Sequence, residues 1–378
     1  MMRRYIRDQW FRLFRDSVCH SEGKAAIAES LRGLLHHHAD AASALSNTES
    51  PYENIGTPIS RTSAWGRPFV VVTGRFRSGS TLLWNLFRQA DDVTAYYEPL
   101  NERRWFDRSR RSDFVDATHR GVTNYWQEYD GLEELAKYYR EEWTHSRLFM
   151  DEHAWEPDLQ RYIECLVAST HRTAVLQFNR IDFRLPWITR RFPDAKIVHI
   201  MRHPRDQWIS TLGFMRSSGS PSFGPTDGNL SDFAPHDKYY LNTWVADLRY
   251  WFPFLDQATE HHPYRSYYLL WKLSYMFARM YADVSIRFED LVSNPRSVLE
   301  SMFDRLELSM PAWERLQGLI ETPSMERWKA YASNDWFCEH ESQCEYQLNE
   351  YLHTVRGEKF VGARRSGDVE RVHAGILD

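Results

Sequence analysis

The chain has 378 residues and a formal net charge of −5, and 42% of its residues are hydrophobic. This length and composition suffice for one large α/β domain with elaborations, or for two domains. The acidic balance does not predict a nucleic-acid partner, so local groups must meet any phosphate that the protein binds. The cysteines are scattered without paired spacing, as is typical of a reducing compartment; they are Cys19, Cys165, Cys338 and Cys344.

The N-terminal part, residues 1–66, is predicted to be a helix followed by a polar linker. No stretch of the sequence approaches the roughly 18 apolar residues of a membrane span, and the N-terminus lacks the apolar core of a signal peptide. We therefore expect a cytoplasmic protein. Trp10 and Phe14 lie beside arginines in the predicted helix, which would dock on the domain or, alternatively, make a peripheral contact with an anionic membrane.

The domain core is predicted to begin at residue 67, with a strand, a tight loop and a helix in succession. Phe69 to Val72 form an apolar, mostly β-branched run of the kind found in buried strands, and Gly74 ends it. A helix is expected from Thr81, with Ser78 or Ser80 as its N-cap. The N–H groups of the loop and helix would then converge on one point, as in an anion site.

The spacing of this loop is that of the Walker A motif, G-x-x-x-x-G-[K]-[ST], but Ser80 stands where the motif has its lysine. A nucleoside triphosphatase uses that lysine, together with magnesium, to neutralise phosphate charge. The loop offers instead the hydroxyls of Ser78, Ser80 and Thr81 and the guanidinium of Arg77. Such a set suits a transferring group of lower charge, and a sulfuryl group fits this description.

A second strand is expected to end before Glu98, in the segment VTAYYEPL (93–100). Residues 101–170 follow, rich in Arg, Glu, Trp and Tyr with helical periodicity. We expect a helical insertion here, placed over the carboxyl ends of the strands, where open α/β sheets bind ligands.

A further motif, FPDAKIVHIMRHPRDQWISTL, spans residues 192–212. Lys196 to Met201 read as a buried strand that leads into Arg202, a turn with proline, and a helix that carries Ser210. An arginine at the end of a strand gives bidentate recognition of phosphate, and the serine adds a hydroxyl. Alternatively, Arg202 forms a surface ion pair with Asp206 at helical spacing.

Together with the strand and "EDL…NP" turn of residues 284–306, these motifs resemble the sulfotransferases that use 3′-phosphoadenosine 5′-phosphosulfate (PAPS). The resemblance implies an α/β, P-loop-like three-layer fold with a central parallel sheet, in a domain spanning 67–310. It assigns the 3′-phosphate to Arg202 and Ser210. No metal is expected, because Ser80 replaces the Walker lysine and no paired aspartates follow a strand as magnesium ligands. The 5′-phosphosulfate is assigned to the loop residues Arg75, Arg77, Ser78, Gly79, Ser80 and Thr81.

Glu98 is the candidate base, because the Glu-Pro after the second strand is most similar to that of carbohydrate sulfotransferases and their bacterial relatives. Alternatively, Glu98 only binds the acceptor or pairs with Arg103. Gln177 stands where the family often has a lysine, which leaves open whether Arg77 or Arg180 meets the sulfuryl oxygens. The roles of Arg180 and Arg184 stay open at this point.

Three later features are less specific. Residues 216–237 hold several Gly and Pro residues and are expected to form a mobile loop near the acceptor, or else a surface insertion. Residues 311–378 are expected to be a helical extension, in which 362–371 faintly resemble a loop that closes over the nucleotide. Cys338, His340 and Cys344 lack the fourth ligand and the spacing of a zinc site.

The sequence thus predicts a sulfotransferase that moves a sulfuryl group from PAPS to a hydroxyl of a carbohydrate or glycolipid, a small-molecule or glycan acceptor. Aromatic residues make up 15% of the chain, and some would suit a sugar ring, although most belong to the core. The alternatives are a nucleotide kinase with a degenerate loop and a catalytically inactive nucleotide-binding regulator. The sequence specifies neither the acceptor nor the oligomeric state.

Overall fold

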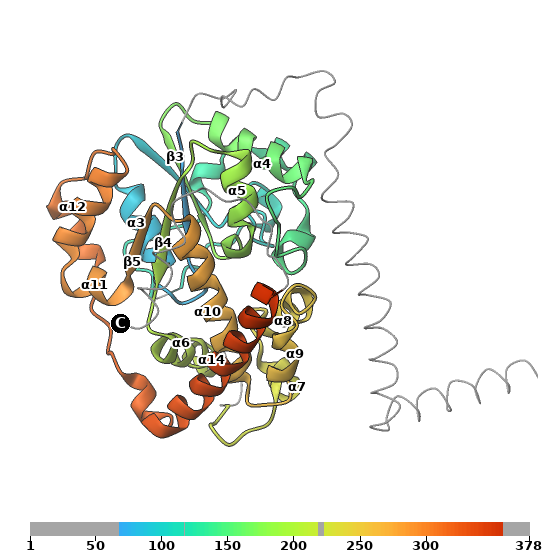
Figure 1. The fold of residues 1–378 in the computed structure, drawn as a ribbon. Coiled ribbons are helices and arrows are strands. Elements are labelled where there is room, and N and C mark those ends of the chain that lie inside the picture. Colours follow the sequence, from blue (N-terminus) through green and yellow to red (C-terminus); the bar gives the residue numbers. More distant parts are fainter. Residues whose placement is uncertain (1–67, 117, 218–222, 358–378) are drawn as a thin grey trace, which may run out of the picture.

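The computed structural model describes residues 68–116, 118–217 and 223–357, and a parallel five-stranded sheet forms its centre (Figure 1). The strand order is β2-β3-β1-β4-β5. The strands are β1 (Val70–Thr73), β2 (Val93–Tyr97), β3 (Thr173–Phe178), β4 (Lys196–Met201) and β5 (Val284–Arg287). All neighbouring pairs are parallel, which confirms the predicted fold class.

The sheet is covered by helices on both faces, which gives three layers (Figure 1). On one face lie α3 (Ser80–Arg88), α11 (Phe288–Ser293) and α12 (Pro295–Arg305). The other face carries α4 (Pro157–Ala168), α5 (Leu185–Arg191) and α10 (Pro263–Tyr281). β1 is fully buried and β4 is buried except at its two end residues, as their apolar sequences require when both faces of the sheet are covered.

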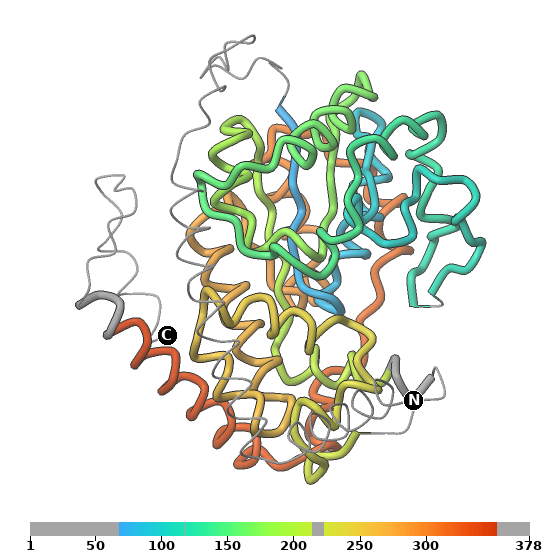
Figure 2. The backbone as a smooth tube through the Cα atoms, turned by 90° about the vertical axis from the view of Figure 1, so that its right-hand side faces the viewer, coloured from blue at the N-terminus to red at the C-terminus, as the bar shows by residue number. Residues whose placement is uncertain are grey.

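A second group of helices gathers beyond the carboxyl ends of the strands, in the lower half of Figure 1. It contains α6 (Pro204–Ser217), α7 (Leu230–Phe233), α8 (Leu241–Leu248), α9 (Phe254–Ala258) and the long α14 (Asn334–Gly357). Figure 2 shows α14 along the outside of this group, whereas the short α13 (Trp313–Leu316) precedes it. Within the described ranges, no helix has the length and apolarity needed to cross a bilayer.

The insertion between β2 and β3 is less regular than its sequence predicts. Apart from α4, it contains short 3₁₀ turns, at Arg108–Arg110, Gln127–Tyr129, Glu133–Lys137 and Glu141–Thr144. Between residues 101 and 156 the insertion therefore has short 3₁₀ turns in place of longer regular helices. The aromatic side chains that suggested helical periodicity pack inward from turns instead, as Tyr129 and Trp143 show.

Arg184 anchors this irregular segment to the sheet. Its buried guanidinium donates hydrogen bonds to the carbonyl oxygens of Arg147 (3.1 Å), Trp143 (3.0 Å) and Ser146 (3.0 Å) in the insertion. A fourth bond reaches the carbonyl oxygen of Arg180 at 2.8 Å. Burial lowers the pKa of Arg184 to about 10, so the side chain still carries its charge near neutral pH. Its role is to hold backbone groups in place.

The described part of the glycine- and proline-rich stretch is packed rather than loose. Phe223, Leu230 and Phe233 are buried, and Asn229 and Asp232 form a capping box at the start of α7. Residues 223–237 therefore form a short helix and turns that bury these apolar side chains between α6 and α10. Residues 218–222 lie outside the described residues, as do the predicted N-terminal helix and linker and the segment 362–371.

The loop with Walker A-like spacing joins β1 to α3, and the N-cap residue of α3 differs from the prediction. Gly79 is the N-cap residue of α3, with φ of 96° and no side-chain cap hydrogen bond. Neither Ser78 nor Ser80 caps the helix, because the Ser78 hydroxyl is buried and that of Ser80 bonds to Asn179. The left-handed backbone favours glycine at position 79, and so does the lack of room for a side chain there. A Cβ atom at this position would lie 2.3 Å from the Phe288 ring.

We expect Gly79→Ala to destabilise the fold much more than Gly131→Ala. Both glycines have positive φ, but a Cβ atom at Gly131 meets nothing within 4 Å. Gly131→Ala should therefore cost only the backbone term, about 1 kcal/mol. Gly79→Ala must also displace the Phe288 ring and should cost about 3 kcal/mol in free energy of unfolding, measured in urea. Equal losses would show that the contact with Phe288 does not constrain the loop.

Candidate functional site

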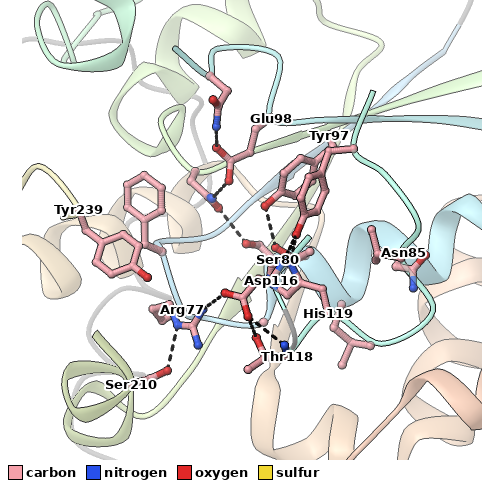
Figure 3. Close-up of a pocket in the computed structure, with 18 of the residues that line it drawn as sticks. Arg77, Ser80, Asn85, Tyr97, Glu98, Asp116, Thr118, His119, Ser210 and Tyr239 are labelled. Atoms are coloured by element: carbon pink, nitrogen blue, oxygen red, sulfur yellow. Dashed lines mark hydrogen bonds and ion pairs between the residues drawn. The ribbon is translucent and has the colours of Figure 1, made fainter. Parts of the chain in front are cut away.

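A cavity of about 730 Å³ opens at the carboxyl ends of β1, β2, β3 and β4 (Figure 3). Most side chains that the sequence singled out line it. They are Arg77, Gly79, Ser80, Thr81, Glu98, Arg202 and Ser210. Segments that are more than 100 residues apart in the chain thus meet at one site, as expected for ligand binding in an open α/β sheet.

Strand register explains why these side chains converge. Tyr97 at the end of β2 is paired with Gln177, and Thr73 at the end of β1 is paired with Phe178 and with His199. The residues that follow β2 and β3, Glu98 and Asn179, therefore emerge at the same edge as the loop after β1.

A hydrogen-bond chain runs across this edge from the loop to Glu98 (Figure 3). The Ser80 hydroxyl donates to Asn179 Oδ1 at 2.8 Å, and Asn179 Nδ2 donates to Glu98 Oε1. Asn101 Nδ2 and Arg180 Nη1 donate to Glu98 Oε2, at 2.7 and 2.8 Å. The carboxylate is thus held by three donors. The backbone of Glu98 is in the left-handed region, with φ of 39°, and strain of this kind is found at functional sites.

Arg180 is the ion-pair partner of Glu98, rather than the Arg103 that the sequence suggested. Its guanidinium is almost fully buried and also donates to Glu102 Oε2 at 2.8 Å. It lies 5.0 Å from the ring centre of Phe76 and 5.3 Å from that of Tyr240. Burial opposes its charge, but Glu98 and Glu102 outweigh this effect and raise the pKa of Arg180. Arg180 is therefore a fixed cation that is already engaged by two carboxylates.

Gln177 occupies the β3 position where a lysine was expected, and it joins the same network. Its buried side chain donates from Nε2 to Asn179 Oδ1 at 3.0 Å. Asn179 Oδ1 thus accepts from both Ser80 and Gln177, which fixes the orientation of the Asn179 amide.

Arg77 links the loop to the second motif. Its Nε donates to Ser210 Oγ at 3.0 Å, and its Nη1 lies 3.5 Å from the carboxylate of Asp116 (Figure 3). Like Glu98, Arg77 has a positive φ, of 66°. The loop arginine and the α6 serine therefore act on the same part of the cavity.

Arg202 lies beside Arg77 and Ser210, and its guanidinium is buried. It sits 4.9 Å from the centre of the Phe288 ring, and its buried Nε has no hydrogen-bond partner among the described residues. Burial lowers the pKa of Arg202, whereas Asp206 and Glu289 oppose this shift. The Asp206 carboxylate accepts hydrogen bonds from the backbone N–H groups of Glu326 and Arg327, at 3.0 and 2.9 Å, rather than closing on Arg202 as the sequence alternative proposed.

Two residues that the resemblance assigned to the donor lie behind the loop instead. The Arg75 guanidinium stacks 4.5 Å from the ring centre of Trp244, and the Ser78 hydroxyl is buried. Both border a small space next to His199 and Gln207, not the large cavity. Burial lowers the pKa of Arg75, and the buried Asp182 opposes this shift. The two side chains support the loop from its inner face.

Residues outside the motifs complete the cavity wall. From the insertion come Asp116 and His119, whose Nδ1 lies 2.6 Å from the Tyr125 hydroxyl. Burial lowers the pKa of His119 to about 4, with Asp116 opposing, so the imidazole is neutral near pH 7. The only sequence signal for these residues was that the insertion would cover the strand ends.

The C-terminal segment also reaches the cavity, which no sequence pattern indicated. Leu319, Glu321 and Arg327 line it. Arg120 and Glu321 form an exposed ion pair of 2.8 Å between the insertion and this segment. The two bonds that Asp206 accepts from residues 326 and 327 hold the segment against α6.

Metal ligands are not clustered in the part of the chain that the structure describes: no group of three or more His, Cys, Asp or Glu side chains is arranged to hold an ion. Cys338 and His340 bond instead to Arg205 (3.4 Å) and Arg265 (2.8 Å). Cys344 is buried and bonds to the Arg265 carbonyl oxygen at 3.7 Å.

Comparison with known structures finds several sulfotransferases of low sequence identity. The chain is similar to the sulfotransferase from Alicyclobacillus acidocaldarius (15% identity, TM-score 0.40, 76% of this chain and 96% of that one). It is also similar to sulfotransferase STF1 from Mycobacterium tuberculosis (13%, 0.38, 73% and 77%). A third is mouse sulfotransferase SULT7A1 complexed with PAP (11%, 0.33, 81% and 87%). No curated protein matches the chain significantly.

The family model described as the sulfotransferase family matches residues 68–313, which is more than half of the chain. This range begins at β1 and ends at the start of α13. It therefore contains the whole sheet, the loop between β1 and α3, and the Arg202–Ser210 motif. The chain therefore belongs to the sulfotransferase family.

Proposed function

We propose that this enzyme transfers a sulfuryl group from PAPS to a hydroxyl group of a carbohydrate or glycolipid. One observation carries the proposal: a single cavity holds the β1–α3 loop, the Arg202–Ser210 motif and the carboxylate of Glu98. Membership of the sulfotransferase family supports PAPS as the donor.

The residues present fit a donor that carries one phosphate on the 3′ position and another on the 5′ position of its ribose. Arg202 has a buried Nε without a partner among the described residues, and a buried unsatisfied donor of this kind favours an anion as ligand. Ser210 and Arg77 lie together next to it. At the start of α3, the first intrahelical bond runs from Leu83 N to Gly79 O, so the preceding N–H groups are available to an anion.

PAPS supplies a sulfuryl group together with a phosphate leaving group. Of the two candidate cations, Arg180 is held by two carboxylates, which favours Arg77 as the group that stabilises negative charge on the departing oxygen. The Ser80 hydroxyl and the N–H groups at the start of α3 would act with it. Glu98 would accept the proton of the acceptor hydroxyl.

The acceptor assignment rests on the cavity wall around Glu98. Phe76, Phe114, Tyr239 and Tyr240 line the cavity and are at least partly exposed. Aromatic faces of this kind pack against sugar rings, and nearby polar groups bond to hydroxyls. Several other aromatic side chains at the wall, such as Trp105, are largely buried and belong to the core.

A cytoplasmic location is part of the same proposal and is supported by the cysteines. Cys165, Cys338 and Cys344 are free thiols, as expected in a reducing compartment.

The assignment of Arg202 predicts a selective loss of nucleotide affinity. Arg202→Met keeps an apolar side chain against Phe288 but removes the charge. It should weaken binding of adenosine 3′,5′-bisphosphate by about 2 kcal/mol, roughly 30-fold, the scale of a charge-assisted hydrogen bond. Adenosine 5′-phosphosulfate lacks the 3′-phosphate, so calorimetry should show nearly unchanged binding. If both ligands lose affinity equally, Arg202 supports the structure and not the 3′-phosphate.

The role of Glu98 can be separated from its place in the network. Glu98→Gln should lower the turnover rate about 100-fold or more if Glu98 is the base. This single variant also turns an amide N–H toward existing donors. The double variant Glu98→Gln/Asn179→Asp reverses the bond between the two side chains, and the carboxylate introduced at position 179 would still accept from Ser80 and Gln177.

We expect the double variant to regain thermal stability and affinity for adenosine 3′,5′-bisphosphate, while turnover stays low. Recovery of turnover would mean that Glu98 only positions other groups. A raised Michaelis constant for the acceptor with normal turnover would mean that Glu98 binds the acceptor. Steady-state kinetics and melting curves on the wild type and both variants distinguish these outcomes.

A further inference from the structure

From the charges that face this cavity, we infer that the acceptor carries a negatively charged group of its own, such as a carboxylate, recognised by Arg103 and Lys238. This inference rests on the proposed function and narrows its acceptor class. Both side chains line the cavity and are exposed.

Three other cations of the cavity already face carboxylates. Arg180 faces Glu98 and Glu102, Arg77 faces Asp116, and Arg120 faces Glu321. Arg202 lies beside Arg77 and Ser210, where the 3′-phosphate of the donor is proposed to bind. These pairings leave Arg103, Lys238 and Arg327. Arg327 lies against α6, the helix of Ser210, where its guanidinium is 3.6 Å from a Cβ atom built at Gly213, so Arg103 and Lys238 are the two that do not adjoin the donor motif.

Arg103 and Lys238 differ from the matched cations. Among the described residues, neither has an ion-pair partner; the Arg103 guanidinium lies 5.9 Å from the ring centre of Trp105. An exposed cation on an open surface is simply solvated, but here both belong to the wall of the cavity that holds the proposed base.

Arg103 is fixed relative to Glu98 by one residue. Asn101 donates from Nδ2 to the Glu98 carboxylate at 2.7 Å, and its Oδ1 accepts from the backbone N–H of Arg103 at 2.9 Å. The Asn101 N–H in turn bonds to the Glu98 carbonyl oxygen at 3.0 Å. The turn therefore fixes the backbone of Arg103 relative to the proposed base.

Lys238 belongs to a second fixed turn. Asp237 accepts hydrogen bonds from the N–H groups of Tyr239 (3.1 Å) and Asn242 (2.8 Å), which ties residues 237–242 together. Tyr239 packs against Phe76, with ring centres 5.1 Å apart, and Figure 3 shows it on the side of Glu98 away from Tyr97.

Arg180 connects the two turns. It bonds to Glu98 of the first turn and lies against Tyr240 of the second. The turns that carry Arg103 and Lys238 thus both contact the Glu98–Arg180 pair, the place proposed for the acceptor hydroxyl. An acceptor anion at this place gains charge-assisted hydrogen bonds, whereas a neutral acceptor leaves both charges unmatched.

The test compares two glycosides that differ only at one sugar carbon. p-Nitrophenyl β-D-glucuronide carries a carboxylate where p-nitrophenyl β-D-glucoside carries a hydroxymethyl group. Each is titrated by calorimetry into the full chain, with and without adenosine 3′,5′-bisphosphate. We expect the wild type to bind the glucuronide at least about tenfold more tightly. Arg103→Met and Lys238→Met should each reduce this preference severalfold, without changing affinity for the bisphosphate.

Arg110→Met is the matched control, because it removes an exposed arginine from the same insertion but outside the cavity wall. Its glucuronide preference should equal that of the wild type. Equal binding of the two glycosides by the wild type, binding of neither, or a preference that survives in both cavity variants would overturn the inference. Failure to bind the bisphosphate would count against the proposed function itself, and normal bisphosphate binding without a glucuronide preference counts against the inference alone.

Discussion

The bond chain from Ser80 through Asn179 to Glu98 is the interaction on which the rest of this site depends. It exists because β1, β2 and β3 are parallel and end at the same level, so that the residue after each strand meets its neighbours. The chain couples the loop that would hold the donor to the carboxylate that would receive a proton. A change in one therefore alters the position of the other.

The two arginines that follow strands at this edge, Arg180 and Arg202, have different surroundings. Arg180 is balanced by two carboxylates and is buried, so it fixes Glu98 and shapes the cavity. Arg202 is buried without such a partner at Nε among the described residues, which is costly unless an anion binds there. The fold thus pairs one strand-end cation with two carboxylates, whereas the other, which we propose to bind the donor, keeps an unpaired Nε among the described residues.

Much of this arrangement was predictable from the sequence. The buried strands before Gly74, Glu98 and Arg202 are short apolar runs, and a parallel sheet requires their ends to share an edge. Glu98, Ser80, Arg202 and Ser210 could therefore be placed together from the order of their motifs. The Walker-like spacing likewise located the helix start to within one residue, although not its cap.

The sequence could not predict contacts that depend on long-range packing. Asp116 and Arg327 carry no motif, and both lie at the cavity through long-range contacts. The N–H of Asp116 donates to the Tyr125 hydroxyl and its carboxylate faces Arg77, whereas the N–H of Arg327 donates to Asp206. Arg75 looks identical in kind to Arg77, two residues later, yet the turn sends one to Trp244 and the other to Ser210. The 3₁₀ turns of the insertion likewise follow from tertiary packing that overrides helical periodicity.

The most direct test of the proposed chemistry is to incubate the protein with radiolabelled PAPS, a panel of carbohydrate and glycolipid acceptors, and an excess of chelator. Because Ser80 replaces the lysine that acts with magnesium in nucleoside triphosphatases, we predict that labelled sulfate reaches an acceptor hydroxyl and that the chelator does not stop it. Phosphate transfer from ATP with a strict requirement for magnesium, and no transfer from PAPS, would contradict this prediction.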